Sequence, residues 1–214
     1  MSNLYVVFTK TNTKLGYIIR KFIQYKYNHV FVCDSLYLKG FSFGRKYYKL
    51  AFVGGLVEEN LNRILYPKKT AEIKIYKIPV SELQLECYNS YINRIKNSKK
   101  SYLYNNLAFI NIIFKKKLSL YNVHNCVTFV LKLLLELNIS LDRYVSSDEI
   151  NFISPKDLDN LLKNYEHREM LIDETSNFFY DASPSTYLKK FTILQMIKIN
   201  LKYIWLLFSR IKHT

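Results

Sequence analysis

The segment from Cys126 to Leu137, CVTFVLKLLLEL, constrains the fold more than any other part of the chain. It is apolar on nearly all faces, and a helix of that kind is stable only where other elements cover it on every side. We therefore expect it to be the central buried helix. A chain of 214 residues is long enough to build one domain around such a helix, but not comfortably two.

The rest of the chain predicts an α+β fold with an antiparallel sheet. Short β-branched and aromatic runs indicate strands, whereas apolar residues at helical spacing indicate helices. Strands are expected at 4–8, 29–34, 37–43, 46–53 and 71–78, the last of them ended by Pro79. Helices are expected at 14–25, over about sixteen residues from Ser81, and at 107–114, 126–137 and 154–164.

A boundary is expected at Asp181 to Ser185, DASPS, which separates a main domain over 1–180 from a C-terminal helix over 186–214. The stretch 191–211 of that helix is strongly apolar, but Lys198, Lys202 and Arg210 interrupt it. Two lysines near its middle make a membrane span costly. An apolar stripe with basic flanks suits an interfacial helix or a partner groove, and docking back onto the main domain is the alternative.

Charge and cysteine content exclude some functions. The formal charge of +15 comes mostly from Lys that occurs together with Asn, Ile and Tyr, so it indicates a compositional bias, and nucleic-acid binding is not expected. The three cysteines form no CxxC pair, which predicts neither a zinc site nor a disulfide framework. We expect no cofactor and no metal. The N-terminal residues show no secretory leader, and we expect a cytoplasmic protein that could lie at the periphery of a membrane.

Cys126 and His29 are the candidates for nucleophilic chemistry. Cys126 stands where a polar segment gives way to the central helix, so the helix dipole and the free amides of the first turn would favour a thiolate and an oxyanion. His29 opens a strand and could serve as the base. The alternatives are a buried, inert cysteine and a histidine that only supports the scaffold.

Several segments, taken in order, resemble the circularly permuted branch of the NlpC-type papain-like superfamily, the YiiX-like hydrolases. The resemblance covers roughly residues 3–165. It runs through a first strand and helix leading to His29, FSFGR at 41–45, GGLVEEN at 54–60, YLYN at 102–105, Cys-x-x-Phe-Val at 126–130 and Ser-Pro-x-Asp-Leu at 154–158. The histidine precedes the cysteine, which is the order that circular permutation produces.

The resemblance implies a papain-like domain with an antiparallel sheet packed against the helix that bears Cys126. It implies a thiol hydrolase, a peptidase or amidase, that cleaves an amide or ester in a peptide, amide or lipid-ester substrate. In this group the residue after the cysteine is often Ser, where this chain has Val127, and an aromatic and an apolar residue precede it, where this chain has His124 and Asn125. The alternative is therefore an inactive binding module, associated with a membrane through its C-terminal helix.

A third group normally orients the histidine of such a site. The GGLVEEN segment indicates Glu59, with Glu58 as the rival, because a slip of one residue in strand register exchanges the two faces. Arg45 could clamp a substrate carboxylate or phosphate, or tie two loops together. Tyr104, with Tyr102, could line a substrate groove.

The remaining cysteines and histidines are assigned other roles. We expect Cys33 and Cys87 to pack in the core. His124 is the alternative base, and His167 and His213 are expected to be exposed.

Overall fold

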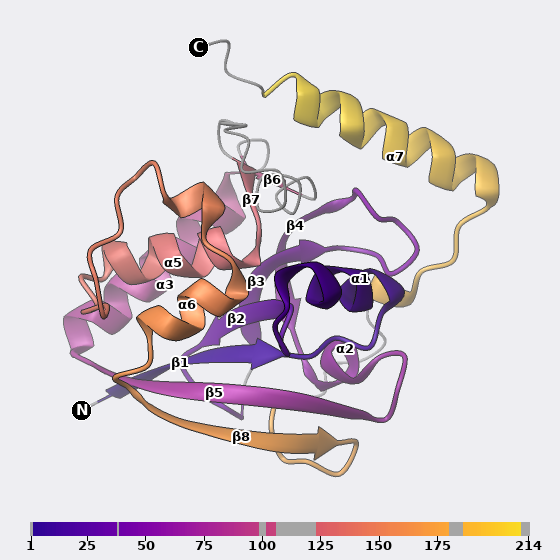
Figure 1. Ribbon diagram of the computed structural model, residues 1–214. Coiled ribbons are helices and arrows are strands. Elements are labelled where there is room, and N and C mark those ends of the chain that lie inside the picture. The colour runs from indigo at the N-terminus through magenta and orange to yellow at the C-terminus, as the bar shows by residue number, and fades with distance from the viewer. Residues whose placement is uncertain (1, 38, 99–101, 106–122, 180–185, 211–214) are drawn as a thin grey trace.

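The computed structural model describes residues 2–37, 39–98, 102–105, 123–179 and 186–210. Its central feature is an antiparallel sheet of six strands in the order β4-β3-β2-β1-β5-β8 (Figure 1). The strands are β1 Ser2–Thr9, β2 His29–Cys33, β3 Gly40–Arg45, β4 Gly54–Glu59, β5 Thr70–Val80 and β8 Glu166–Asp173. Two further short strands, β6 Leu103–Tyr104 and β7 Val123–His124, pair in parallel. The predicted α+β class is confirmed.

Helices cover both faces of the sheet. They are α1 Lys14–Ile23, α2 Leu61–Leu65, α3 Glu82–Asn97, α5 Cys126–Glu136, α6 Pro155–Leu161 and α7 Ile193–Phe208, with short 3₁₀ turns at Ile150–Phe152 and Thr186–Leu188. The side chains of Ser81, Asn125 and Ser154 cap α3, α5 and α6 by accepting from the amide three residues on. These reciprocal caps satisfy amides that no helical carbonyl can reach, so the helix starts are determined locally.

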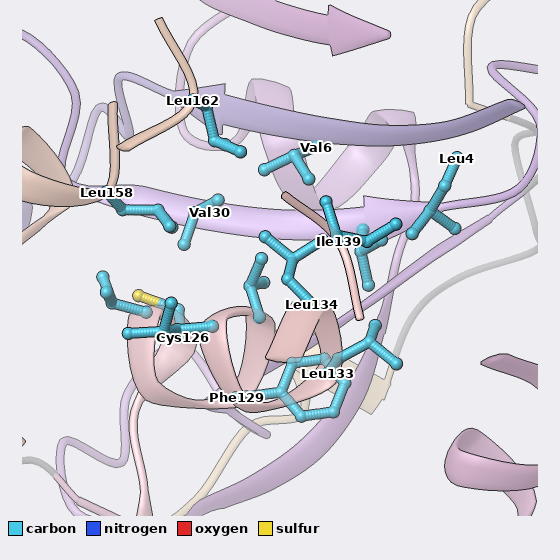
Figure 2. Packing of buried hydrophobic residues seen from close by; sticks show 14 of the residues in the cluster. Leu4, Val6, Val30, Cys126, Phe129, Leu133, Leu134, Ile139, Leu158 and Leu162 are labelled. Atoms are coloured by element: carbon cyan, nitrogen blue, oxygen red, sulfur yellow. The ribbon is translucent and has the colours of Figure 1, made fainter. Parts of the chain in front are cut away.

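The alternation of side chains along the strands creates two cores. Leu4, Val6 and Phe8 of β1 point to the face that carries α3, α5 and α6, whereas Val7 points to the face that carries α2. The α5 helix is buried along most of its length, as its sequence predicted. Figure 2 shows Leu134 of α5 directed toward Val6 of the sheet, with Cys126 at the start of the helix.

The structure corrects three expectations about the strands. The third strand of the meander is 54–59, not 46–53, which forms a loop. Pro79 does not end β5: it lies opposite Asn3 of β1, and the strand continues to Val80, opposite Ser2. Pairing with β8 stops at Lys77, so β5 has a partner on only one side at Pro79, where a missing N–H is tolerated. The edge strand β8 was not predicted.

The predictions that Cys33 and Cys87 pack in the core have opposite outcomes. Cys33 is buried as expected, but Cys87 is exposed, because Tyr88, Tyr91 and Ile92 form the buried face of α3. The expected helix at 107–114, the boundary at 181–185 and His213 lie outside the described residues. Among the helices that are described, none combines the length and the hydropathy needed to cross a bilayer.

Candidate active site

Cys126 is the first residue of α5, and Asn125 is its N-cap. The Asn125 side chain accepts from the Thr128 amide at 2.8 Å, and the Asn125 amide donates to the Thr128 hydroxyl at 2.9 Å. The amides of Cys126 and Val127 belong to the first turn and have no acceptor within the helix. They and the helix dipole therefore favour negative charge beside the Cys126 sulfur.

His29 is the first residue of β2, and Glu59 is the last residue of β4. The His29 Nε2 atom lies 2.9 Å from Glu59 Oε1. The pairing register places His29 opposite Thr9, and Glu59 opposite Gly40, on the sheet face that α2 covers. The α5 helix lies on the other face, and Cys126 interacts with His29 where both elements begin, since His29 is the first residue of β2 and Cys126 is the first residue of α5.

Two further side chains hold the Glu59 carboxylate, which is only 4% exposed. The Ser42 hydroxyl, on β3, donates to Glu59 Oε1 at 2.7 Å and lies 3.3 Å from His29 Nε2. Arg63 Nε, on α2, donates to Glu59 Oε2 at 3.0 Å, and its Nη2 donates to the Arg45 carbonyl at 3.0 Å. Both carboxylate oxygens therefore have charged or polar partners, which a buried carboxylate requires.

These contacts set the charge states of the pair. Burial by itself lowers the pKa of His29, but the charge of Glu59 and hydrogen bonding with Cys126 and Glu59 raise it to about 10. Burial by itself raises the pKa of Glu59, but the positive charges of Arg63 and His29 outweigh that effect and hold the pKa below its ordinary value. The geometry thus favours an imidazolium beside Cys126 and an ionised Glu59.

A pocket of about 310 Å³ opens onto these residues. Cys126, His29 and Glu59 all line it, together with Arg45 and Tyr104. Much of the remaining wall is apolar and includes Leu15, Ile19 and Ile23 of α1 and Phe52 and Val127. A mostly apolar pocket with a few convergent polar groups is typical of a small-molecule or substrate site.

Arg45 and Tyr104 have structural contacts as well as a place in the pocket wall. Arg45 Nη1 donates to the Tyr48 carbonyl at 3.1 Å, three residues further along in the loop that follows β3, so this contact is local and does not join two separate loops. Tyr104 packs against Gly54, where an added Cβ would lie 2.4 Å from Tyr104 Cδ1. Tyr102 is not among the residues of the pocket wall.

The rival residues lie elsewhere. Glu58 is 44% exposed and pairs with Lys39 and Lys96. His124 is buried against Phe43 and Tyr102, and burial, with a smaller effect from Lys132, lowers its pKa to about 3. A histidine that resists protonation is poorly suited to hold the proton of a thiol. His167 is exposed on β8, as expected.

Sequence reasoning did not single out Ser42, Arg63 or Asn105. The spacing of Glu59 and Arg63, four residues apart at a helix start, is the signal that could have suggested their ion pair. Ser42 lies within the FSFGR segment but was given no role. Asn105 lines the pocket and is buried, and its Oδ1 has no hydrogen-bond partner among the described residues.

A scan against protein-family models, a search of curated proteins and a search of solved structures each found no match to the chain. Within the described ranges, no three His, Cys, Asp or Glu side chains are grouped so that they could hold a metal ion.

Proposed function

We propose that this protein is a thiol hydrolase that cleaves an amide or ester through Cys126 and His29, with Glu59 as the orienting residue. The observation that carries the proposal is the meeting of Cys126, His29 and Glu59 in one pocket from positions far apart in the sequence. A nucleophile, a base that interacts with it and a group that orients the base are the parts such chemistry needs.

In the proposed reaction the two ring nitrogens of His29 have different roles. Nε2 donates to Glu59, which leaves Nδ1 to receive the proton of Cys126. The thiolate then attacks the substrate carbonyl carbon, and a C–S bond forms as the carbonyl becomes an oxyanion. When the oxyanion collapses, the imidazolium donates its proton to the departing amine or alcohol, and water later releases the acid from the thioester.

The residues around Cys126 and His29 support both the oxyanion and the imidazolium that form during the proposed reaction. The first-turn amides of α5 are donors for the oxyanion, since they point out of the helix start where Cys126 stands. The Glu59 carboxylate stabilises the imidazolium, and Arg63 and Ser42 keep that carboxylate in place.

We infer that the domain is a circularly permuted NlpC-type papain-like fold. The support is the order of the parts: the base and its partner come from an antiparallel sheet early in the chain, and the nucleophile comes later at the start of the central helix. The segments that resemble the YiiX-like hydrolases include His29, Ser42, Glu59 and Cys126, which are the residues of the site.

Thiol labelling tests the proposal. We would treat the protein with iodoacetamide near neutral pH and follow each cysteine by peptide mass spectrometry. Cys126 is buried and Cys87 is exposed, so exposure alone predicts faster labelling of Cys87. A nucleophilic Cys126 is expected to react at least about tenfold faster than Cys87 despite its burial.

Variants connect the labelling rate to the site. His29→Asn is expected to slow labelling of Cys126, whereas His167→Asn, at an exposed histidine on β8, is the matched control and should leave it unchanged. Hydrolysis of a p-nitrophenyl ester should disappear with Cys126→Ser. If Cys126 reacts more slowly than Cys87 in the unmodified chain, the residue is an inert core cysteine and the hydrolase proposal fails.

A further inference from the structure

The C-terminal helix α7 docks on the main domain with one face only. Asn200 Oδ1 accepts from the Phe52 amide at 3.2 Å, and the Tyr203 hydroxyl donates to the Gly54 carbonyl at 2.9 Å. Leu207 on the same face is buried. The helix is thereby attached to the loop before β4 and to the first residue of β4, which is one of the two edge strands of the sheet (Figure 1).

The opposite face of α7 is apolar and exposed. Its exposed residues follow helical spacing and form one stripe along the axis: Ile193, Leu194, Ile197, Leu201, Trp205 and Phe208. Trp205 is 69% exposed and Leu194 is 80% exposed. A contiguous apolar stripe of this length on a folded domain marks a surface that binds something.

The charged residues of α7 and of its described sequence flanks all have the same sign. Lys198 and Lys202 lie on α7 beside the stripe, Lys189 and Lys190 precede the helix, and Arg210 follows it. No Asp or Glu occurs after Asp181 in the chain. An apolar face whose charged neighbours on the described part of the helix and its flanks are cations complements a surface that is apolar inside and negatively charged outside.

We propose that the exposed face of α7 binds the surface of a membrane that contains anionic lipids. The helix lies in the plane of the interface, with Leu201 and Trp205 among the acyl chains and the lysines at the phosphate groups. With 16 residues α7 is shorter than a bilayer span requires. A second copy of the chain fits less well, because packing two stripes together would bring basic flanks against basic flanks.

The chain contains a single tryptophan, Trp205, which lies on the proposed surface and reports its environment directly. We would add vesicles of phosphatidylcholine, or of phosphatidylcholine with phosphatidylserine, to the full chain and record its fluorescence and cosedimentation. With phosphatidylserine the emission is expected to shift to shorter wavelength and the protein to sediment, because Trp205 leaves water. High salt should weaken both effects, since screening reduces the attraction to the lipid charge.

Two variants separate the apolar and the electrostatic contributions while keeping Trp205. Ile197→Ser with Leu201→Ser should weaken vesicle binding by about tenfold or more, because both side chains then lose apolar burial. Lys198→Gln with Lys202→Gln should weaken binding to phosphatidylserine vesicles by about thirtyfold. The second pair keeps the apolar face and tests the proposal even if the first pair disturbs the helix.

The matched control is Leu83→Ser with Leu171→Ser, which removes equally exposed leucines from α3 and β8 and should leave binding unchanged. The proposal is overturned if no vesicle shifts the emission of Trp205, or if the lysine variants bind like the unmodified chain. It is also overturned if the shift occurs without lipid and grows with protein concentration, because the stripe would then bind a second copy. The proposal does not depend on the hydrolase chemistry, and none of these variants touches the residues of the site.

Discussion

Replacing Glu59 with Gln tests how the candidate site is held together. Gln keeps the shape of Glu but removes the charge that faces both His29 and Arg63. The Arg63 side chain is only 10% exposed, so its guanidinium would remain buried without its ion-pair partner. Removing one member of a buried pair costs about 3–5 kcal/mol, far more than the pair itself contributes.

The pKa of His29 provides a second measure of the same loss. The pKa rises from an ordinary 6.5 to about 10 in the folded chain, a difference of about 3.5. At about 1.4 kcal/mol per pKa unit, the site favours the imidazolium by at most about 5 kcal/mol. Glu59 is the largest of the favourable causes, and therefore Glu59→Gln should lower the pKa of His29 clearly below 10.

Urea unfolding and histidine NMR titration measure these two effects. With a slope near 2 kcal/mol per molar urea, a loss of about 3–5 kcal/mol moves the unfolding midpoint down by about 1.5–2.5 M. Glu58→Gln is the matched control, because Glu58 is 44% exposed and its ion pairs with lysines contribute at most about 1 kcal/mol. If both variants unfold at the same urea concentration, or if the pKa of His29 stays near 10 in Glu59→Gln, the assigned ion-pair network is refuted.

Two further predictions concern pH and packing. The raised pKa of His29 contributes stability that is complete below pH 6.5 and disappears as pH rises toward 10, whereas the lowered pKa of Glu59 contributes stability that disappears as pH falls below 4.5. The urea concentration at the unfolding midpoint should therefore decline as pH rises above 6.5. A midpoint that stays constant up to pH 10 would contradict this prediction. Gly54→Ala should destabilise the fold by about 1–3 kcal/mol in the same assay, because its Cβ would lie 2.4 Å from Tyr104 Cδ1 and 2.5 Å from a backbone oxygen. Gly55→Ala is its control, since the nearest atom there is a lysine side-chain carbon at 3.5 Å, and equal losses for the two variants would refute the packing argument.

Local rules were sufficient for the helices that have strong signals. The apolar run from Cys126 predicted a buried central helix, and the structure buries α5 on the sheet. Ser81 and Ser154 predicted the starts of α3 and α6, because a cap and the helix it begins lie within four residues of each other. Such features need no information from distant parts of the chain.

Strand assignments depended on pairing, which is not local. The edge strand β8 contains Glu166, His167, Arg168 and Glu169, which have little strand signal, and it exists because β5 offers it a partner along its length. Pro79 was expected to end β5, yet the strand continues because β1 still pairs with it there. Backbone hydrogen bonds to a neighbouring strand outweighed the local preferences.

The site shows the same division between local and tertiary information. The sequence by itself placed Cys126 at a helix start, His29 at a strand start and two adjacent glutamates between them. Only the register of β3 with β4 decided that Glu59 turns inward to His29 while Glu58 turns out to lysines, since a shift of one residue would exchange them. Only packing brought Ser42 to Glu59 and exposed Cys87, because burial is a property of the assembled layers and the residue type alone does not determine it.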